Sequence, residues 1–206
     1  MFSQRSKRGF VAFSNQFIAR SSNADPLNLR LFKSLTIQEF MPQPTLFIFS
    51  GLPAAGKTTL ARALATSLAI TYLRIDTIEQ ALRDLCHVQV EGEGYRLTYR
   101  IAADVLQLGL SVVADSCNPI GLTRREWEAV ATENSASFVN IEVVCSDQGE
   151  HRQRVGSRRT DIETLQLPTW QDVLSRNYEP WSGDRLIVDT AGKTIEDSVT
   201  ALLRQL

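Results

Sequence analysis

Apolar and polar residues along positions 44–206 form two alternating patterns. Short, mostly apolar runs of strand length occupy residues 46–49, 70–76, 111–115, 137–145 and 185–189. Between these runs, apolar residues recur with the 3.6-residue period of an amphipathic helix, as at Ile195, Val199, Leu202 and Leu206. Strands that alternate with helices predict an α/β domain with a parallel sheet covered on both faces.

Local signals predict where three of the helices begin or end. Thr77 with Gln80, and Thr123 with Glu126, have the three-residue spacing of a capping box at a helix N-terminus. Gly109 follows a helical apolar period and is expected to end that helix, because glycine readily adopts a left-handed conformation.

The bend after the first predicted strand reads GLPAAGKTT and contains the phosphate-binding pattern G-x-x-x-x-G-K-[ST]. Its glycines let successive backbone N–H groups point inward at a helix N-terminus, which forms a cradle for an anion. Lys57 is expected to reach the β- and γ-phosphates of ATP, and the Thr58 hydroxyl to bind Mg²⁺. The alternative is a glycine-rich turn with a surface lysine. The predicted nucleotide-binding residues are Gly51, Leu52, Pro53, Ala54, Ala55, Gly56, Lys57, Thr58 and Thr59.

Three of the predicted strands end in an aspartate. Ligands of such sheets bind beyond the carboxyl ends of the strands, although any single aspartate there can instead cap a helix or form a turn. Asp76 suits the group that accepts the proton of an acceptor hydroxyl. Asp115 suits the carboxylate that holds Mg²⁺, directly or through water. We interpret Asp189 as part of a turn near the adenine.

Arginines crowd the segment of residues 146–161, which is expected to begin as a helix and end in a loop. A lid over the nucleotide needs such charge, because phosphoryl transfer spreads negative charge over the migrating oxygens. Arg158 and Arg159 are the better candidates for this contact, whereas Arg152 and Arg154 also suit ion pairs with acidic neighbours. A solvated basic face is the alternative for the whole segment.

An aromatic segment follows, with Trp170, Tyr178 and Trp181. Aromatic residues at this spacing are typical of core and helix packing. The alternative is that they wall the acceptor or adenine pocket beside Glu179.

The composition favours a cytoplasmic enzyme. The net charge of −1 gives no overall basic field for nucleic acid or an anionic membrane, and no apolar run approaches the roughly 18 residues of a membrane span. Cys86, Cys117 and Cys145 are odd in number and lack C-x-x-C spacing, which indicates a reducing compartment without structural zinc. We expect these cysteines in the core, and a monomer or homodimer.

Residues 1–40 differ from the rest: they carry Arg5, Lys7, Arg8 and Arg20 with no acidic residue before Asp25, and they show no strong period. Met41 stands five residues before the first predicted strand. Three interpretations remain open: a start codon assigned too far upstream, an arginine- and serine-rich targeting segment, or an appended arm. We therefore expect residues 1–43 to be an amino-terminal extension, disordered or a start-site artefact, and residues 44–206 to be the catalytic domain.

Six segments together carry a resemblance to a known family: SGLPAAGKTTLA, RIDTIEQAL, VVADSCNP, HRQRVGSRR, NYEPW and LIVDTAGKT. Through them, residues 44–206 resemble the small bacterial P-loop proteins labelled AAA-family ATPases or predicted kinases. This branch is similar to adenylylsulfate, gluconate and chloramphenicol kinases, zeta toxins and polynucleotide 5′-kinase. The resemblance implies a P-loop NTPase of the nucleotide-kinase type, a three-layer sandwich with strand order 2-3-1-4-5 and a lid. It also implies a proton acceptor at Asp76, a metal- or substrate-side carboxylate at Asp115, and a lid arginine at Arg158 or Arg159.

Missing motifs narrow the expected chemistry. The chain has no N-K-x-D guanine-binding motif, no L-S-G-G-Q-like transporter signature and no second acidic residue beside Asp115. We therefore expect a kinase that moves the γ-phosphoryl group of ATP to a hydroxyl of a small acceptor, with Mg²⁺. The alternatives are a polynucleotide 5′-kinase, a slow ATPase or ATP-binding regulator, and a zeta-like toxin that acts on sugar nucleotides. Nucleic acid is the less favoured acceptor, because little basic groove with interleaved aromatic residues lies beyond the lid.

Overall fold

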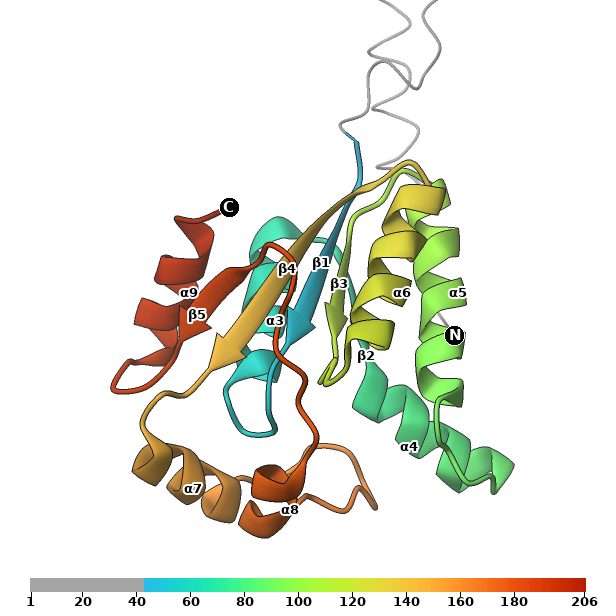
Figure 1. The fold of residues 1–206 in the computed structure, drawn as a ribbon. Helices are drawn as coiled ribbons and strands as arrows, with labels where there is room; N and C mark the ends of the chain where they lie inside the picture. The colour runs from blue at the N-terminus through green and yellow to red at the C-terminus, as the bar shows by residue number, and fades with distance from the viewer. Residues whose placement is uncertain (1–42) are drawn as a thin grey trace, which may run out of the picture. The chain divides into compact units, whose positions relative to one another are not determined.

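One five-stranded sheet organises residues 43–206, the part of the chain that the computed structural model describes. Its strands are β1 (Thr45–Ser50), β2 (Thr71–Arg74), β3 (Val112–Asp115), β4 (Ser137–Val144) and β5 (Leu186–Asp189). They lie in the order β2-β3-β1-β4-β5, and each neighbouring pair is parallel (Figure 1). This arrangement confirms the predicted fold class and strand order. The prediction for residues 1–43 falls, except for Gln43, outside the described residues.

Helices cover both faces of this sheet. They are α3 (Lys57–Leu68), α4 (Ile75–Cys86), α5 (Glu93–Gln107), α6 (Gly121–Glu133), α7 (Gln148–Ser157), α8 (Trp170–Ser175) and α9 (Ile195–Leu203). Helices α3 and α9 lie on one face and α5 and α6 on the other, while α7 and α8 lie beyond the carboxyl ends of the strands (Figure 1). Within residues 43–206, no helix is both long enough and apolar enough to cross a bilayer.

The central strand β1 shows why the sheet is buried on both sides. Phe47 and Phe49 belong to the core that α3 and α9 cover, whereas Leu46 and Ile48 belong to the core under α5 and α6. Side chains alternate between the two faces of a strand, so a continuous apolar run supplies both cores. The second core includes Trp127, which is 0% exposed.

The predicted start of α4 is wrong. Strand β2 passes into α4 at Ile75 without a loop, so Thr77 lies inside the first turn and does not cap the helix. Ile75 is 3% exposed and packs in the core, so this burial sets the start of the helix. Gln80 donates hydrogen bonds to Asp84 and to Thr164 instead of closing a capping box.

The predicted start of α6 is also wrong, because the N-cap is Ile120, three residues before Thr123. The helix begins at Gly121, whose N–H donates to the Glu179 carboxylate at 2.6 Å. Thr123 lies within the first turn and donates its hydroxyl to the Ile120 carbonyl at 3.0 Å. The capping group therefore comes from a distant segment of the chain, which local spacing cannot reveal. Gly109 follows the end of α5 with φ of 77°, as expected.

Candidate functional site

Two glycines of the phosphate loop, residues 51–58, occupy positions that no other residue fits. Gly51 has φ of 135°, and a Cβ there would lie 2.1 Å from the Val143 carbonyl oxygen on β4. Gly56 has φ of 102°, and a Cβ there would lie 3.3 Å from the Thr190 side chain. Left-handed backbone without a Cβ is what lets the loop wrap its N–H groups inward. The loop therefore has the conformation that its sequence predicts.

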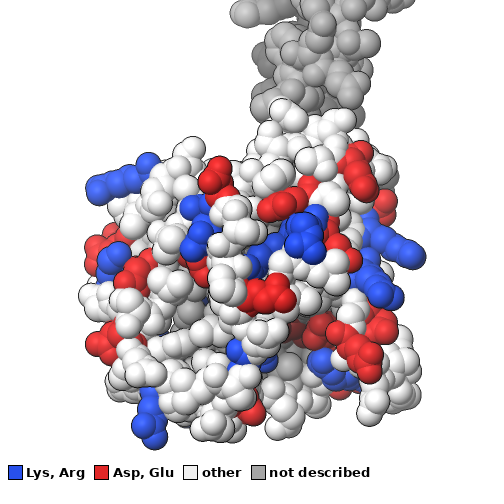
Figure 2. Space-filling view, in the orientation of Figure 1, with Lys and Arg blue, Asp and Glu red and all other residues white. Residues whose placement is uncertain are grey.

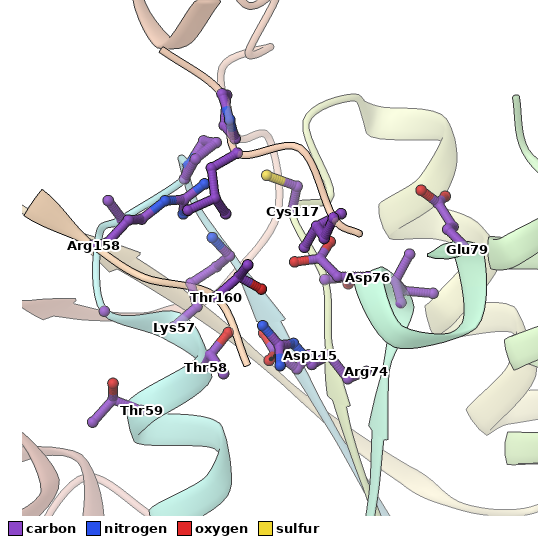
Figure 3. Close-up of a pocket in the computed structure, with 18 of the residues that line it drawn as sticks. Lys57, Thr58, Thr59, Arg74, Asp76, Glu79, Asp115, Cys117, Arg158 and Thr160 are labelled. Carbon is purple, nitrogen blue, oxygen red and sulfur yellow. Dashed lines mark ion pairs between the residues drawn. The ribbon is translucent and has the colours of Figure 1, made fainter. Parts of the chain in front are cut away.

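The predicted phosphate ligand Lys57 stands at the first position of α3. Its side chain is buried, and its Nζ donates to the Leu52 carbonyl at 2.9 Å. Figure 3 shows Lys57 and Thr58 on the side of the loop that faces Asp115, with Thr59 farther away. The structure therefore brings the ammonium group and one hydroxyl to the same cavity.

That cavity has a volume of about 1320 Å³. It extends from the phosphate loop to the N-terminal turns of α4, α5 and α6, and the lid segment, residues 158–168, lines its outer side. Cavities for one drug-sized ligand measure roughly 300–1000 Å³. The volume is sufficient for a nucleotide together with a second small molecule.

Asp115 ends β3 beside the phosphate loop. It pairs in register with Phe49 of β1 and with Arg74 of β2, and it is 4% exposed. Its Oδ2 accepts a hydrogen bond from the Tyr72 hydroxyl at 2.7 Å and lies 4.0 Å from Arg74 Nε. Burial and this carboxylate raise the pKa of the Tyr72 phenol well above its ordinary value.

The oxygens near Asp115 fit a small hard cation. Its Oδ1 accepts no hydrogen bond from any described residue, and the Thr58 hydroxyl lies in the same cavity. Mg²⁺ typically takes one or two protein oxygens and completes its shell with phosphate and water. Within residues 43–206, no group of three or more His, Cys, Asp or Glu forms a separate metal site.

Asp76 lies in the first turn of α4 and not at the end of a strand, which corrects its predicted position. The side chain is exposed, lines the cavity and has no hydrogen bond or ion pair with any described residue. Figure 3 shows its carboxylate across the cavity from Lys57. The structure thus keeps the predicted proximity to the phosphate loop, although the element differs.

The two candidate lid arginines differ in environment. Arg158 is partly buried, and its Nε has no hydrogen-bond partner among the described residues. Burial lowers the pKa of its guanidinium, while the nearby Asp76 carboxylate acts in the opposite direction. Arg159 also lines the cavity but is exposed. A partly buried guanidinium whose Nε has no partner among the described residues favours Arg158 as the group that meets an anion.

The other two arginines have the roles expected of ion-pairing or solvated residues. Arg154 pairs with Glu150 at 2.5 Å and donates to the Thr190 hydroxyl at 2.7 Å. Arg152 is exposed and does not line the cavity. Arg154 lines the cavity as Arg158 and Arg159 do, but its guanidinium is already paired, and of the four arginines Arg152 alone lies outside the cavity.

Helix α7 is attached to the phosphate loop by a residue that sequence reasoning missed. His151 is 6% exposed, and its Nε2 lies 2.8 Å from the Pro53 carbonyl. Since a carbonyl only accepts, Nε2 carries the proton. The Trp170 ring packs edge-on against His151 with centroids 5.3 Å apart, so Trp170 supports this contact from outside the cavity.

A second missed residue, Asp161, joins the lid segment to the sheet. Its carboxylate accepts a hydrogen bond from Arg74 at 2.8 Å and another from Arg62. These two guanidiniums hold the pKa of Asp161 well below its usual range. Farther along the segment, the Thr164 hydroxyl donates to Asp84 of α4 at 2.8 Å. The lid segment is therefore held against α3, β2 and α4.

The aromatic segment packs around a buried arginine. The Arg124 guanidinium carbon lies 4.2 Å from the Trp181 ring centroid and 5.0 Å from that of Tyr178. The same guanidinium donates to four backbone carbonyls, at residues 118, 119, 179 and 180. Neither ring lines the large cavity, which favours the packing interpretation. Arg124 fixes the loop at residues 116–120, which does line the cavity.

Two further predictions concern residues near this site. The cysteines are not core residues: Cys86 is exposed, and Cys117 and Cys145 are partly exposed. Cys117 instead lines the cavity, and its carbonyl accepts a hydrogen bond from Gly51 N at 3.1 Å. Asp189 forms a turn, because it accepts from the backbone N–H groups of Ser146 and Ala191. Its predicted place near adenine stays a prediction.

The fold and the phosphate loop together define a P-loop NTPase with the kinase arrangement of strands. Residues 46–180 match the family model AAA_33, which is described as an AAA domain. The chain belongs to this family.

Solved structures share the fold. A protein from Chloroflexus aurantiacus J-10-fl, described as a candidate kinase, has a TM-score of 0.59 and 25% identity, and the match covers 80% of this chain and 97% of that one. APS kinase from Mycobacterium tuberculosis, in complex with AMPPNP and APS, has a TM-score of 0.55 and 16% identity over 79% and 97% of the two chains. A gluconokinase from Sinorhizobium meliloti 1021 has a TM-score of 0.55 and 15% identity over 79% and 91%. The comparison with curated proteins gave no match.

Proposed function

We propose that this protein is a kinase that transfers the γ-phosphoryl group of ATP to a hydroxyl of a small acceptor, with Mg²⁺. One observation carries the proposal. A single cavity holds the phosphate loop with Lys57 and, facing it, the unpaired carboxylate of Asp76. A protein that only binds or hydrolyses ATP needs the first of these groups, whereas a kinase also needs a base beside its acceptor.

In this proposal the loop end of the cavity binds the nucleotide. The inward N–H groups and the N-terminus of α3 hold the β-phosphate, and Lys57 exchanges its contact with the Leu52 carbonyl for phosphate oxygens. Thr58 and Asp115 are the residues that would hold Mg²⁺. When bound, Mg²⁺ would neutralise charge on the β- and γ-phosphates. Arg158 stabilises the charge that grows on the phosphoryl oxygens during transfer.

The transfer itself is a single displacement. Asp76 accepts the proton of the acceptor hydroxyl, and the oxygen of that hydroxyl forms a bond to the γ-phosphorus. The bond between this phosphorus and the β–γ bridging oxygen breaks, and ADP leaves with the electron pair. The products are ADP, the phosphorylated acceptor and one proton, which Asp76 returns to solvent.

Two features support a small acceptor over a polynucleotide. Figure 2 shows positive and negative side chains interspersed over the face that it presents, without a continuous basic stripe for a phosphate backbone. The lid segment is also held over the cavity through Asp161 and Thr164, which favours an enclosed ligand.

The decisive experiment compares Asp76→Asn with Asp115→Asn. A panel of hydroxylated metabolites, nucleosides and 5′-hydroxyl oligonucleotides first identifies an acceptor by acceptor-dependent ADP release. Asp76→Asn should then lower acceptor phosphorylation by about 10² to 10⁴, the range for a positioned general base, with MgATP affinity changed less than about threefold. Asp115→Asn should alter the Mg²⁺ dependence. Asp104→Asn, an exposed change on α5 outside the cavity, is the matched control.

Each alternative has its own outcome. If Asp76→Asn loses ATP binding and Asp115→Asn does not, the two roles are exchanged. If ATP binds but no acceptor stimulates turnover, the protein is an ATP-binding regulator or slow ATPase. Stimulation by 5′-hydroxyl oligonucleotides alone would identify a polynucleotide kinase.

A further inference from the structure

The two ends of the cavity carry opposite charge. Lys57 and Arg158 lie toward the phosphate loop, whereas Asp76 and Glu79 lie on the opposite side (Figure 3). The cavity residues from α4, the loop before α5, and the first two turns of α5 and α6 form what we call the acceptor end. Its charged members are Asp76, Glu79, Arg83, Glu91, Arg96 and Glu126. Carboxylates outnumber guanidiniums there.

Glu79 is the acceptor-end carboxylate that the fold positions most firmly. It follows Asp76 by three residues on α4, so both side chains lie on one face of the helix. A Cβ at Gly94 would lie 2.2 Å from Glu79 Cγ, so the glycine of α5 makes room for this side chain. Arg83 donates to Glu79 Oε2 at 3.2 Å, and the Glu79 side chain is 19% exposed.

This arrangement leaves one oxygen of Glu79 for a ligand. Oε1 accepts no hydrogen bond from any described residue and is not among the buried unpaired atoms, so it faces accessible space. The acceptor end has two guanidiniums. Arg83 is already paired with Glu79, and Arg96 is exposed to solvent. Arg158 and Arg176 also line the cavity, but on α4 itself the groups with an unpaired oxygen are the two carboxylates, Asp76 and Glu79.

We propose that the acceptor is an uncharged or amine-bearing polyol, and that Glu79 determines this specificity. The inference rests on the proposed kinase function. Two carboxylates at this spacing accept hydrogen bonds from neighbouring hydroxyls or from an ammonium group, while Asp76 takes the proton of the hydroxyl that reacts. They repel a carboxylate or sulfate at the same place.

The test uses acceptors with matched carbon skeletons. Acceptor-stimulated ADP release is measured with C5 and C6 polyols, their 1-amino-1-deoxy derivatives and the corresponding aldonates. The best polyol or amino polyol should have a kcat/KM at least about tenfold above that of its aldonate, the usual scale of discrimination by one contact. Glu79→Gln keeps size and shape but removes the charge, and should reduce this ratio by about tenfold with the KM for MgATP unchanged.

Two further variants separate charge from structure. Glu79→Asp retains the carboxylate and should retain the preference against aldonates, which a merely structural role for Glu79 does not predict. Glu133→Gln, at the exposed end of α6 outside the cavity, is the control for removal of one charge. Melting temperatures of all variants show whether each is folded.

The outcomes distinguish this inference from the function on which it rests. A higher kcat/KM for aldonates, or an unchanged ratio in folded Glu79→Gln, overturns the polyol inference and leaves the kinase intact. Bound MgATP with no stimulation by any compound, here or in the wider panel, removes the kinase function and the inference with it.

Discussion

The two ends of the cavity differ in what forms them: backbone at the phosphate loop and side chains at the acceptor end. The phosphate loop depends on backbone: Gly51 and Gly56 hold left-handed conformations, and Lys57 is buried against the loop itself. The acceptor end depends on side chains from three helices, and Asp76 there is exposed and unpaired among the described residues. The loop end therefore tolerates no side chain at Gly51 or Gly56, whereas the acceptor end can change without refolding. In the proposed kinase, the loop backbone would therefore determine how phosphate is bound, and a few side chains would determine which acceptor is used.

The largest expected effect separates the two lid arginines. Arg158→Ala should lower kcat by about 10³ or more, because a cis guanidinium stabilises the migrating phosphoryl group, while MgATP still binds. Arg159→Ala is the matched control and should change kcat only slightly, since Arg159 is exposed. Steady-state kinetics with saturating MgATP and acceptor measure both. If both variants turn over as fast as the wild type, the arginines of this segment form a solvated basic face and do not contact the phosphoryl group.

The next effect tests the loop end directly. Lys57→Ala should weaken MgATP binding and lower turnover by about 10², the scale for losing one preorganised charged group. Far-ultraviolet circular dichroism should show an intact fold, because the loop conformation rests on its glycines. A folded variant with unchanged MgATP affinity and turnover would mean that the loop is a structural turn.

A third variant tests the loop at residues 116–120, which lines the cavity and leads into the acceptor-end residues of α6. Arg124→Lys keeps the charge but loses the planar stack between Trp181 and Tyr178 and several donors to carbonyls. We expect the free energy of unfolding to fall by about 2 kcal/mol, the scale of a desolvated cation–π contact. The KM for the acceptor should rise more than the KM for MgATP, because Arg124 orders residues 116–120. The exposed neighbour Arg125→Lys is the control, and equal shifts of both constants would contradict a role confined to the acceptor end.

The smallest effect concerns the attachment of the lid segment. Asp161→Asn removes ion pairs with Arg62 and Arg74 in which the aspartate is largely exposed, so the KM for MgATP should rise only about two- to threefold. The folded-state pKa of Asp161 is lowered. The contribution of its ion pairs is therefore complete above the ordinary aspartate pKa and is lost as pH falls through the lowered value.

Limited proteolysis can measure how protonation of Asp161 affects the attachment of the lid segment. Cleavage of the wild-type lid segment should increase as the pH is lowered, whereas Asp161→Asn should show little further change. Glu163→Gln, an exposed neighbour in the same segment, is the control. Identical protection of Asp161→Asn and the wild type at every pH would show that these ion pairs do not hold the segment.

The features that could be predicted from the sequence are those set by local backbone conformation and by the period of apolar residues. Gly51, Gly56 and Lys57 reveal the loop because its geometry restricts these positions to particular residues. The apolar run of β1 predicts a central strand, and Asp115 is found because it ends a clear strand. Asp76 is found for a partly wrong reason, since β2 passes directly into α4.

The remaining site residues are not predictable in this way because their partners are far along the chain. Arg74 meets Asp161 across 87 residues, and Arg124 meets the Glu179 carbonyl across 55. His151 supports the phosphate loop only because α7 packs against it. Glu79 becomes notable only when Gly94 brings α5 close. Nothing in the local spacing of these residues distinguishes them from ordinary surface or helix positions.

The attachment of α7 has a consequence for the order of events during turnover. His151 and Arg154 hold α7 to the phosphate loop and to Thr190, so any swing of the lid segment must pivot beyond Ser157. The first residue past this pivot is Arg158. In the proposed kinase, a swing of the segment would carry Arg158 with it, so closing the site and placing this positive charge would be one movement. A nucleotide bound while the segment is swung away would lack the charge of Arg158, which would slow the transfer of its phosphoryl group to water.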